Sequence, residues 1–121
     1  MPKKVLLADD SQTFLNFYQK VFGALGVEVV QASTGPEAVA LAWKERPDLI
    51  ILDLEMPGMS GAECTRLLKQ DPSCAPIPII LITQHISARD MEVMLRSGCE
   101  EVLAKPVSAR QLQQVLNRHL K

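Results

Sequence analysis

The sequence predicts an α/β protein in which helices cover both faces of a five-stranded parallel sheet. Five short apolar runs alternate with five longer segments whose apolar residues recur at helical spacing. Residues 49–52 show the strand signal best, since four apolar residues stand between Pro47-Asp48 and Pro57-Gly58. So short an apolar run between turn formers is typical of a strand buried on both faces of a parallel sheet. Regular alternation of strand and helix predicts a doubly wound fold.

Length and composition limit the classes of protein to consider. A chain of 121 residues can bury one core and leaves no room for a second domain. The 13 basic and 14 acidic residues give a net charge of −1, so no overall field favours binding to nucleic acid or to a membrane. Cys64, Cys74 and Cys99 lack the spacing of a zinc site and are expected to be free thiols. No signal-like or membrane-length apolar run occurs, which predicts a soluble, cytoplasmic protein.

The first half of the chain predicts two strands, each followed by a helix. Residues 5–8 form an apolar strand that ends at Asp9-Asp10, and the helix that opens at Ser11 ends at Gly26. The β-branched residues of 27–32 predict the second strand. Thr34 and Glu37 match a capping box at the start of the second helix. The expected inner stripes are Phe14, Tyr18, Val21, Phe22 and Leu25, then Ala38, Leu41 and Ala42.

The second half continues the alternation after the strand at 49–52. Ser60 and Glu63 repeat the capping box and open a third helix, and three prolines keep residues 71–78 in a loop. Residues 79–82 are the fourth strand, Ser87 caps a short helix, and residues 102–104 are the fifth strand. The last helix opens at Ser108. The expected inner stripes are Cys64, Leu67 and Leu68, then Met91, Met94 and Leu95, then Leu112, Val115, Leu116 and Leu120.

The candidate site residues follow four of the five predicted strands. Right-handed crossovers leave few topologies, and the flavodoxin-like (βα)5 fold with strand order 2-1-3-4-5 is the common one. In that order the first and third strands are neighbours, so Asp9 and Asp10 meet Asp53 at one sheet edge. Thr83 and Lys105 reach the same edge from the next two strands. Taken alone, Asp53 could also be a turn-forming aspartate.

Together these five residues suit phosphoryl transfer. Three close carboxylates repel one another by roughly 4 kcal/mol per pair at an effective dielectric of about 20, so Lys105 and a divalent cation are needed to offset the repulsion. All-oxygen ligands favour Mg²⁺, or Mn²⁺, over Zn²⁺. The metal, the Thr83 hydroxyl and the Lys105 ammonium can contact the negative oxygens of the transition state. Asp53 is then the nucleophile for an aspartyl phosphate, and Asp9 and Asp10 are metal ligands, directly or through water.

The same residues resemble bacterial response-regulator receiver domains of the chemotaxis type over essentially the whole chain. The resemblance rests on the acidic pair at 9–10, the Asp-x-x-Met-Pro-Gly-x-x-Gly run from Asp53 to Gly61, Thr83, and Lys105-Pro106. It implies that residues 1–121 are one receiver domain. It also implies that Asp53 accepts a phosphoryl group from a sensor histidine kinase or a phosphotransfer protein.

The resemblance implies a role for each of the other site residues. Asp10, Asp53 and the backbone carbonyl of Glu55 bind Mg²⁺ in such domains, and Asp9 helps to position the ion through water. Thr83 and Lys105 contact the phosphoryl group, and the Lys105–Pro106 bond is usually cis.

The resemblance also implies a regulator rather than an enzyme with a separate substrate. Such a domain catalyses only its own phosphorylation and dephosphorylation, and it signals through a conformational switch. The expected partners are the kinase or phosphotransfer protein and a downstream protein or fused output domain, with no direct contact to nucleic acid or membrane. A homodimer through the helix after Ser87, the strand at 102–104 and the last helix is a further option.

Some residues depart from the family pattern or vary within it. Gln84 stands where receivers usually carry a small residue, and we expect it to slow the entry of small phosphodonors and water to Asp53. Val102 replaces the aromatic residue that swings inward in many receivers, so output is expected to run through backbone shifts of the fourth strand and fourth helix, or to be weakly coupled to phosphorylation. Glu55 and His85 occupy positions that tune hydrolysis in the family, and His85 either orients water or is an ordinary surface histidine.

Two other functions stay open at this stage. A pseudo-receiver would bind partners without phosphorylation, which Gln84 and Val102 favour and the intact set of five residues opposes. A small magnesium phosphohydrolase with an aspartyl-phosphate intermediate is the second. Against it, Asp53-Leu54-Glu55 matches the Asp-x-Asp of dehalogenase-type phosphatases only loosely, and 121 residues leave no room for a substrate-specificity cap.

Overall fold

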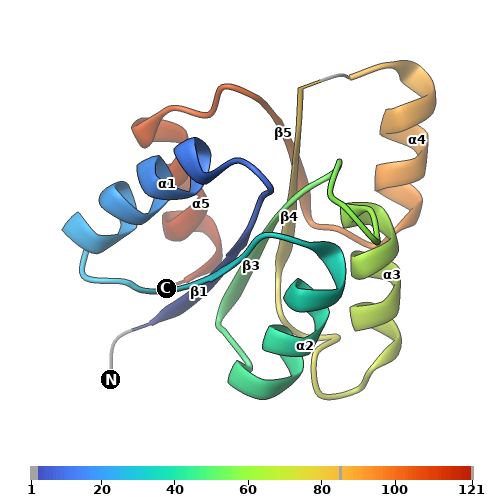
Figure 1. Ribbon diagram of the computed structural model, residues 1–121, viewed down its shortest axis with the longest axis horizontal. Helices are drawn as coiled ribbons and strands as arrows, with labels where there is room; N and C mark the ends of the chain where they lie inside the picture. Colours follow the sequence, from blue (N-terminus) through green and yellow to red (C-terminus); the bar gives the residue numbers. More distant parts are fainter. Residues whose placement is uncertain (1–2, 85, 121) are drawn as a thin grey trace.

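The chain forms a three-layer α/β sandwich in the computed structural model, which describes residues 3–84 and 86–120 (Figure 1). The central parallel sheet has the strand order β2-β1-β3-β4-β5, which confirms the predicted topology. Helices α1 and α5 cover one face of the sheet, and α2, α3 and α4 cover the other (Figure 1). The strands are β1 (Lys4–Ala8), β2 (Glu28–Ala32), β3 (Leu49–Asp53), β4 (Ile79–Thr83) and β5 (Glu101–Ala104). The helices are α1 (Gln12–Ala24), α2 (Gly35–Glu45), α3 (Gly61–Gln70), α4 (Ala88–Arg96) and α5 (Ala109–His119).

Alternate residues of each central strand enter two separate apolar clusters. In β1, Leu6 and Ala8 pack in the cluster that includes α2, α3 and α4, whereas Val5 and Leu7 pack in the cluster that includes α1 and α5. All residues of β3 and β4 are buried, which is why these strands appear in the sequence as unbroken apolar runs. The cluster that includes α2, α3 and α4 takes Ile50 and Leu52 from β3 and Ile79 and Leu81 from β4. The cluster that includes α1 and α5 takes Leu49 and Ile51 from β3 and Ile80 and Ile82 from β4.

Side-chain caps begin the helices where the sequence predicts them. Complete capping boxes form at Ser60 and Ser108, the first residues before α3 and α5. At α2 the Thr34 hydroxyl accepts from the Glu37 N–H as expected. The Glu37 carboxylate, however, accepts from the N–H of Ser33 at 2.7 Å, one residue before the predicted partner. The carboxylate of the capping box at α2 therefore accepts from the residue before the N-cap, Ser33, instead of from the N-cap residue Thr34.

Three leucines that helical spacing placed on inner stripes are exposed instead. Leu25 follows the last residue of α1, and Leu67 and Leu95 lie at the edges of the stripes of α3 and α4. In α4 only Met94 is buried. Leu15 is buried in α1 although it was not on the predicted stripe. Spacing thus predicted the buried side of each helix better than the width of the buried stripe.

Gly61 allows α3 to begin directly against the end of β3. A Cβ atom at this position would overlap the backbone carbonyl of Asp53. The Gly61 N–H donates to the Leu54 carbonyl at 2.8 Å, which closes the loop at 54–60 beside the carboxyl edge of the sheet. The close approach explains why the residue that ends the Asp53 run must be glycine.

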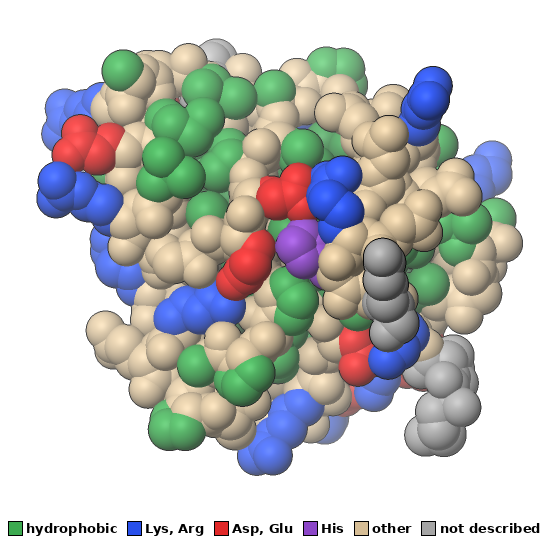
Figure 2. Space-filling model, turned by 180° about the vertical axis from the view of Figure 1, so that it is seen from behind, with side chains coloured by type: hydrophobic (Ala, Val, Ile, Leu, Met, Phe, Trp, Pro, Cys, Tyr) green, Lys and Arg blue, Asp and Glu red, His purple; other side chains and the backbone are tan. Residues whose placement is uncertain are grey.

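Charges of both signs are interspersed with apolar side chains on the face shown in Figure 2. One such group is held by β5 and α5, where the Glu101 carboxylate pairs with Arg118 and His119, each at 2.6 Å. Within residues 3–84 and 86–120, no helix has both the length and the hydropathy needed to cross a membrane.

Candidate functional site

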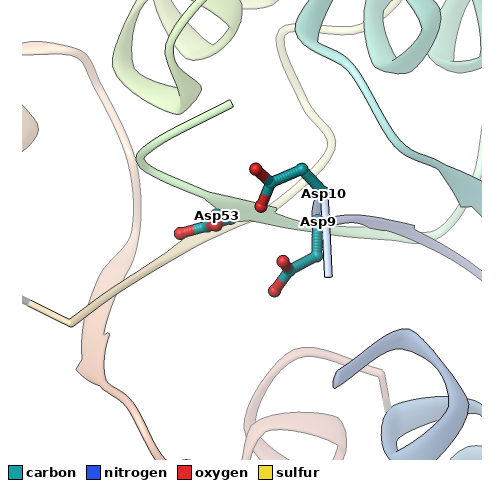
Figure 3. A group of neighbouring side chains, drawn as sticks. All are labelled: Asp9, Asp10 and Asp53. Carbon is teal, nitrogen blue, oxygen red and sulfur yellow. The ribbon is translucent and has the colours of Figure 1, made fainter. Parts of the chain in front are cut away.

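The ends of β1 and β3 bring three aspartates together (Figure 3). Asp9, Asp10 and Asp53 each place a carboxylate oxygen within 4.8 Å of the other two. Asp53 is the last residue of β3, and Asp9 and Asp10 directly follow β1. Because Ala8 pairs with Leu52 in parallel register, the next residues of both strands leave the sheet side by side. Figure 3 shows the side chains of Asp9 and Asp10 pointing in opposite directions from the end of β1.

The three carboxylates differ in their access to water. Asp9 and Asp53 are buried, with 1% and 6% of their surface exposed, whereas Asp10 is exposed. The Asp9 carboxylate accepts from the Ser11 N–H at 2.9 Å, and that of Asp53 accepts a long hydrogen bond from the Glu55 N–H at 3.4 Å. Asp10 is therefore the member of the group that solvent reaches directly.

Lys105 brings a buried positive charge to the group from the end of β5. Its Nζ lies 2.8 Å from Asp9 Oδ2 and 3.2 Å from Asp53 Oδ2, and its side chain is 5% exposed. The same ammonium lies 4.1 Å from the ring centroid of Phe14 in α1. The sequence carried no signal for that contact, because residues 14 and 105 meet only through the tertiary fold. The Lys105–Pro106 bond is cis, as the family resemblance implies.

Burial and like charge make Asp53 an unusual aspartate. Burial raises the pKa of Asp53 to about 6, and the negative charge of Asp9 adds to the rise, while Lys105 opposes it. Burial by itself would lower the pKa of Lys105, but the hydrogen bonds and charges of Asp9 and Asp53 leave that pKa above its ordinary value. Lys105 thus stays charged, and one ammonium faces three carboxylates. The surplus of negative charge favours a bound cation.

A cavity of about 280 Å³ opens onto these residues. Among the residues that line it are Asp10, Asp53, Glu55 and Lys105 from the predicted set, together with Phe14 and Gln84. Thr83 is fully buried at the end of β4, one residue beyond Ile82, the register partner of Asp53. The structure therefore brings all of the predicted site residues to one edge of the sheet.

The two residues that depart from the expected pattern lie in different surroundings. Gln84 is exposed and lines the cavity above Asp53. Val102 is partly buried and packs against the apolar cluster that contains Met94 of α4. His85 lies outside the described residues.

Comparison with known proteins decides the family. The sequence model of the response regulator receiver domain matches residues 5–117. The chain belongs to the response regulator receiver domain family. One receiver relative is the polar-differentiation response regulator DivK of Brucella anthropi, which is 33% identical over 120 residues, 99% of this chain and 98% of DivK. DivK of Brucella ovis is 32% identical over the same shares of the two chains.

Solved receiver structures share the fold over their whole length. The chemotaxis response regulator CheY4 of Vibrio cholerae has a TM-score of 0.92 and 32% identity, covering 99% of this chain and 100% of CheY4. The receiver domain of the sensor histidine kinase PA1611 of Pseudomonas aeruginosa has a TM-score of 0.91 and 28% identity, covering 98% of each chain. That structure holds a magnesium ion in its active-site cleft. The predicted class, a receiver domain of two-component signalling, is confirmed.

Proposed function

We propose that this receiver, taken as one domain over residues 1–121, accepts a phosphoryl group on Asp53 with Mg²⁺ as its metal. The observation that carries the proposal is the position of Asp53. Its buried carboxylate lies between two further carboxylates and the Lys105 ammonium, and it lines a cavity of about 280 Å³. The proposed donor is a phosphohistidine of a sensor histidine kinase or of a phosphotransfer protein.

Asp53 acts as the nucleophile in the proposed reaction. A carboxylate oxygen bonds to phosphorus while the bond from phosphorus to the donor imidazole nitrogen breaks, and its electron pair stays on that nitrogen. Because the pKa of Asp53 is about 6, the carboxylate is the main form at neutral pH. Lys105, 3.2 Å from Asp53 Oδ2, is placed to contact one phosphoryl oxygen, and the Thr83 hydroxyl is proposed to donate to another. In the separate dephosphorylation reaction water attacks phosphorus, the bond from phosphorus to the Asp53 oxygen breaks with its electron pair left on the carboxylate, and inorganic phosphate leaves.

The donor set fits a magnesium ion. Three carboxylates whose oxygens lie within 4.8 Å of one another offer hard oxygen ligands, and the exposure of Asp10 leaves room for bound water. We propose that Asp10, Asp53 and the Glu55 backbone carbonyl hold the ion, and Mn²⁺ suits the same donors. Asp9 already pairs with Lys105 at 2.8 Å, which suits a role through water. When bound, the ion neutralises negative charge on the phosphoryl oxygens.

The proposed output is a conformational signal to a downstream protein or to a fused output domain. Val102 packs against the apolar cluster that contains Met94 of α4, so we propose that a shift at the end of β4 reaches that helix through this cluster. We propose this route in place of the aromatic switch of many receivers. In this scheme the protein is a regulator that catalyses only its own phosphorylation and dephosphorylation.

A pseudo-receiver is the second candidate, and Gln84 is the observation that favours it. Gln84 lines the cavity that opens onto Asp53, and we expect its side chain to narrow the path of a phosphodonor. The buried contacts of Lys105 with Asp9 and Asp53 oppose this alternative, because a partner-binding module has no need of them.

Binding of beryllofluoride, which mimics a phosphoryl group on aspartate, separates the two candidates. We expect beryllofluoride with Mg²⁺ to shift the amide NMR signals at the ends of β3, β4 and β5. The shifts should vanish in Asp53→Ala and persist in Asp48→Ala, which removes an acid next to the opposite end of β3. A wild-type protein that binds no beryllofluoride would favour the pseudo-receiver, and turnover of small phosphate esters would indicate a phosphohydrolase.

A further inference from the structure

The Lys105 ammonium touches a third group besides the two carboxylates. Asp9 Oδ2 lies 2.8 Å and Asp53 Oδ2 3.2 Å from Nζ, and the Phe14 ring centroid lies 4.1 Å from the same atom. At this distance the negative face of an aromatic ring attracts a cation. The Lys105 side chain is 5% exposed, so water does little to weaken this attraction. Two carboxylates and one ring therefore surround the charge.

The ring of Phe14 is itself fixed by the core. It stacks on Tyr18, one turn further along α1, with the ring centroids 6.2 Å apart and the planes at 25°. Tyr18 is 2% exposed and packs with Leu15 and Phe22 in the cluster that includes α1 and α5. The position of Phe14 thus follows from packing beneath it, and Lys105 meets a surface that is already in place.

An aromatic ring suits this position better than another polar group. A further carboxylate would add negative charge to a site that already holds three, and a water molecule would be free to exchange. A ring attracts the ammonium without carrying a net charge and without a strong acceptor that would hold its N–H groups away from oxygen atoms. Phe14 also lines the cavity that opens onto Asp53, so it borders the place where a phosphoryl group would sit.

We propose that Phe14 is a positioning residue that holds the Lys105 ammonium where it reaches Asp53. This proposal rests on the proposed function of Asp53 and Lys105. As the phosphoryl group is transferred, the ammonium exchanges the Asp53 oxygen for a phosphoryl oxygen and remains over the ring. Without the ring, Lys105 samples more orientations, and ordering it during phosphoryl transfer slows the reaction.

Three variants separate positioning from packing. Phe14→Leu removes the ring and keeps apolar bulk, whereas Phe14→Tyr keeps the ring. Phe17→Leu is the matched control, because Phe17 lies on the same helix, is 39% exposed, and contacts Tyr18 edge-on at 6.0 Å. It therefore removes an aromatic neighbour of Tyr18 that is absent from the Lys105 contact and from the cavity lining.

The first readout is the NMR spectrum of the protein without phosphodonor. The ring current of Phe14 should displace the Lys105 side-chain proton signals in wild type, in Phe14→Tyr and in Phe17→Leu, and the displacement should disappear in Phe14→Leu. Unchanged Lys105 signals in Phe14→Leu would overturn the proposal, whatever the protein does with a phosphodonor.

The second readout is the rate of phosphorylation by acetyl phosphate with Mg²⁺. We expect Phe14→Leu to be slower by about 5- to 30-fold, the range that corresponds to about 1 to 2 kcal/mol of lost cation–π attraction. Phe14→Tyr and Phe17→Leu should stay close to wild type. Changed Lys105 signals with an unchanged rate would overturn the positioning role. A wild type that takes up no phosphoryl group would instead contradict the proposed function, and the NMR comparison would still decide whether Phe14 holds Lys105.

Discussion

The two ends of the parallel sheet hold their charges in opposite ways. At the amino end, Lys4 pairs with Glu45 at 2.9 Å and with Glu28 at 3.7 Å, and these side chains are between 26% and 52% exposed. At the carboxyl end, the Lys105, Asp9 and Asp53 side chains are 5%, 1% and 7% exposed. The same sheet therefore carries hydrated ion pairs at one end and a nearly dry group of two carboxylates and one ammonium at the other.

We interpret this contrast as a difference between charges that keep the surface hydrated and charges that are proposed to take part in chemistry. Exposed pairs contribute little to stability, because water screens them and their side chains lose entropy when they pair. A buried group with more carboxylates than cations costs stability in the unliganded protein. A fold keeps such a group where its perturbed pKa values and surplus charge are used, and at this edge they suit a metal and a phosphoryl group.

Removal of one lysine at each end tests the contrast most strongly. Lys105→Met leaves Asp9 and Asp53 buried without their cation, and we expect the free energy of unfolding to fall by about 3 kcal/mol at pH 7 without metal. Lys4→Met breaks exposed pairs and should leave stability almost unchanged. Urea unfolding of both variants measures the difference. Equal losses would show that burial does not distinguish the two ends.

Removal of the Asp53 charge should cause the next largest change in the free energy of unfolding, and the size of this change should depend on pH. The folded-state pKa of about 6 lies above the ordinary value of about 4, so the wild type loses stability as pH rises from 4 through 6. Asp53→Asn does not titrate, and we expect it to be more stable than wild type by about 2 kcal/mol at pH 7.5 without metal, with the gain shrinking towards pH 4.

Thermal or urea unfolding across this pH range measures that gain. Asp48→Asn, next to the amino end of β3, is the control and should show no such gain. A stability difference between Asp53→Asn and wild type that stays constant from pH 4 to 7.5 would contradict the raised pKa.

The fold could be predicted from the sequence because its strands need burial on both faces. Only unbroken apolar runs meet that need, and residues 5–8 and 79–82 fall within one residue of the observed β1 and β4. The convergence of Asp9, Asp10 and Asp53 followed from the strand order. Leu25 is exposed although helical spacing places it on the inner stripe, because spacing alone does not say how much of a helix surface the sheet covers.

The partners of Lys105 could not be predicted in the same way. Asp9 and Asp10 are adjacent acids, and the choice of Asp9 as partner depends on where the Lys105 side chain reaches from the end of β5. The contact with Phe14 joins residues from α1 and from the end of β5, with no local pattern linking them. Strand order places residues at an edge, whereas their pairing depends on side-chain directions that only the tertiary structure shows.

Lys69, near the amino end of β4, should show an intermediate effect. Its ammonium pairs with Glu100 at 2.7 Å and donates to the carbonyls of Ala75 and Ile77, which holds the proline-rich loop against the sheet. We expect Lys69→Met to lower the free energy of unfolding by about 1 to 2 kcal/mol, because two loop carbonyls lose their donor.

Hydrogen exchange should also become faster in the loop at 71–78 of Lys69→Met. Arg96→Met, which breaks an exposed pair with Glu92, is the matched control and should leave this loop unchanged. If the free energy of unfolding fell as far in Lys69→Met as in Lys105→Met, the ion pairs at the amino end of the sheet would contribute as much to stability as the buried group at the carboxyl end.

Gln84 should give the smallest effect, on rates rather than on stability. Because its side chain lines the cavity above Asp53, Gln84→Ala should admit acetyl phosphate and attacking water faster, raising both phosphorylation and dephosphorylation rates. Gln113→Ala on α5, outside the lining of that cavity, should match wild type. Equal rates in wild type and Gln84→Ala would remove Gln84 as a barrier.

The central claim is that the buried carboxylate of Asp53 takes the phosphoryl group. Mass spectrometry of protein treated with acetyl phosphate and Mg²⁺ tests it most directly. We expect the mass of one phosphoryl group on the peptide that contains Asp53, lost in Asp53→Asn and retained in Asp48→Asn. A wild type that gains no such mass, or gains it on a peptide without Asp53, would contradict the claim.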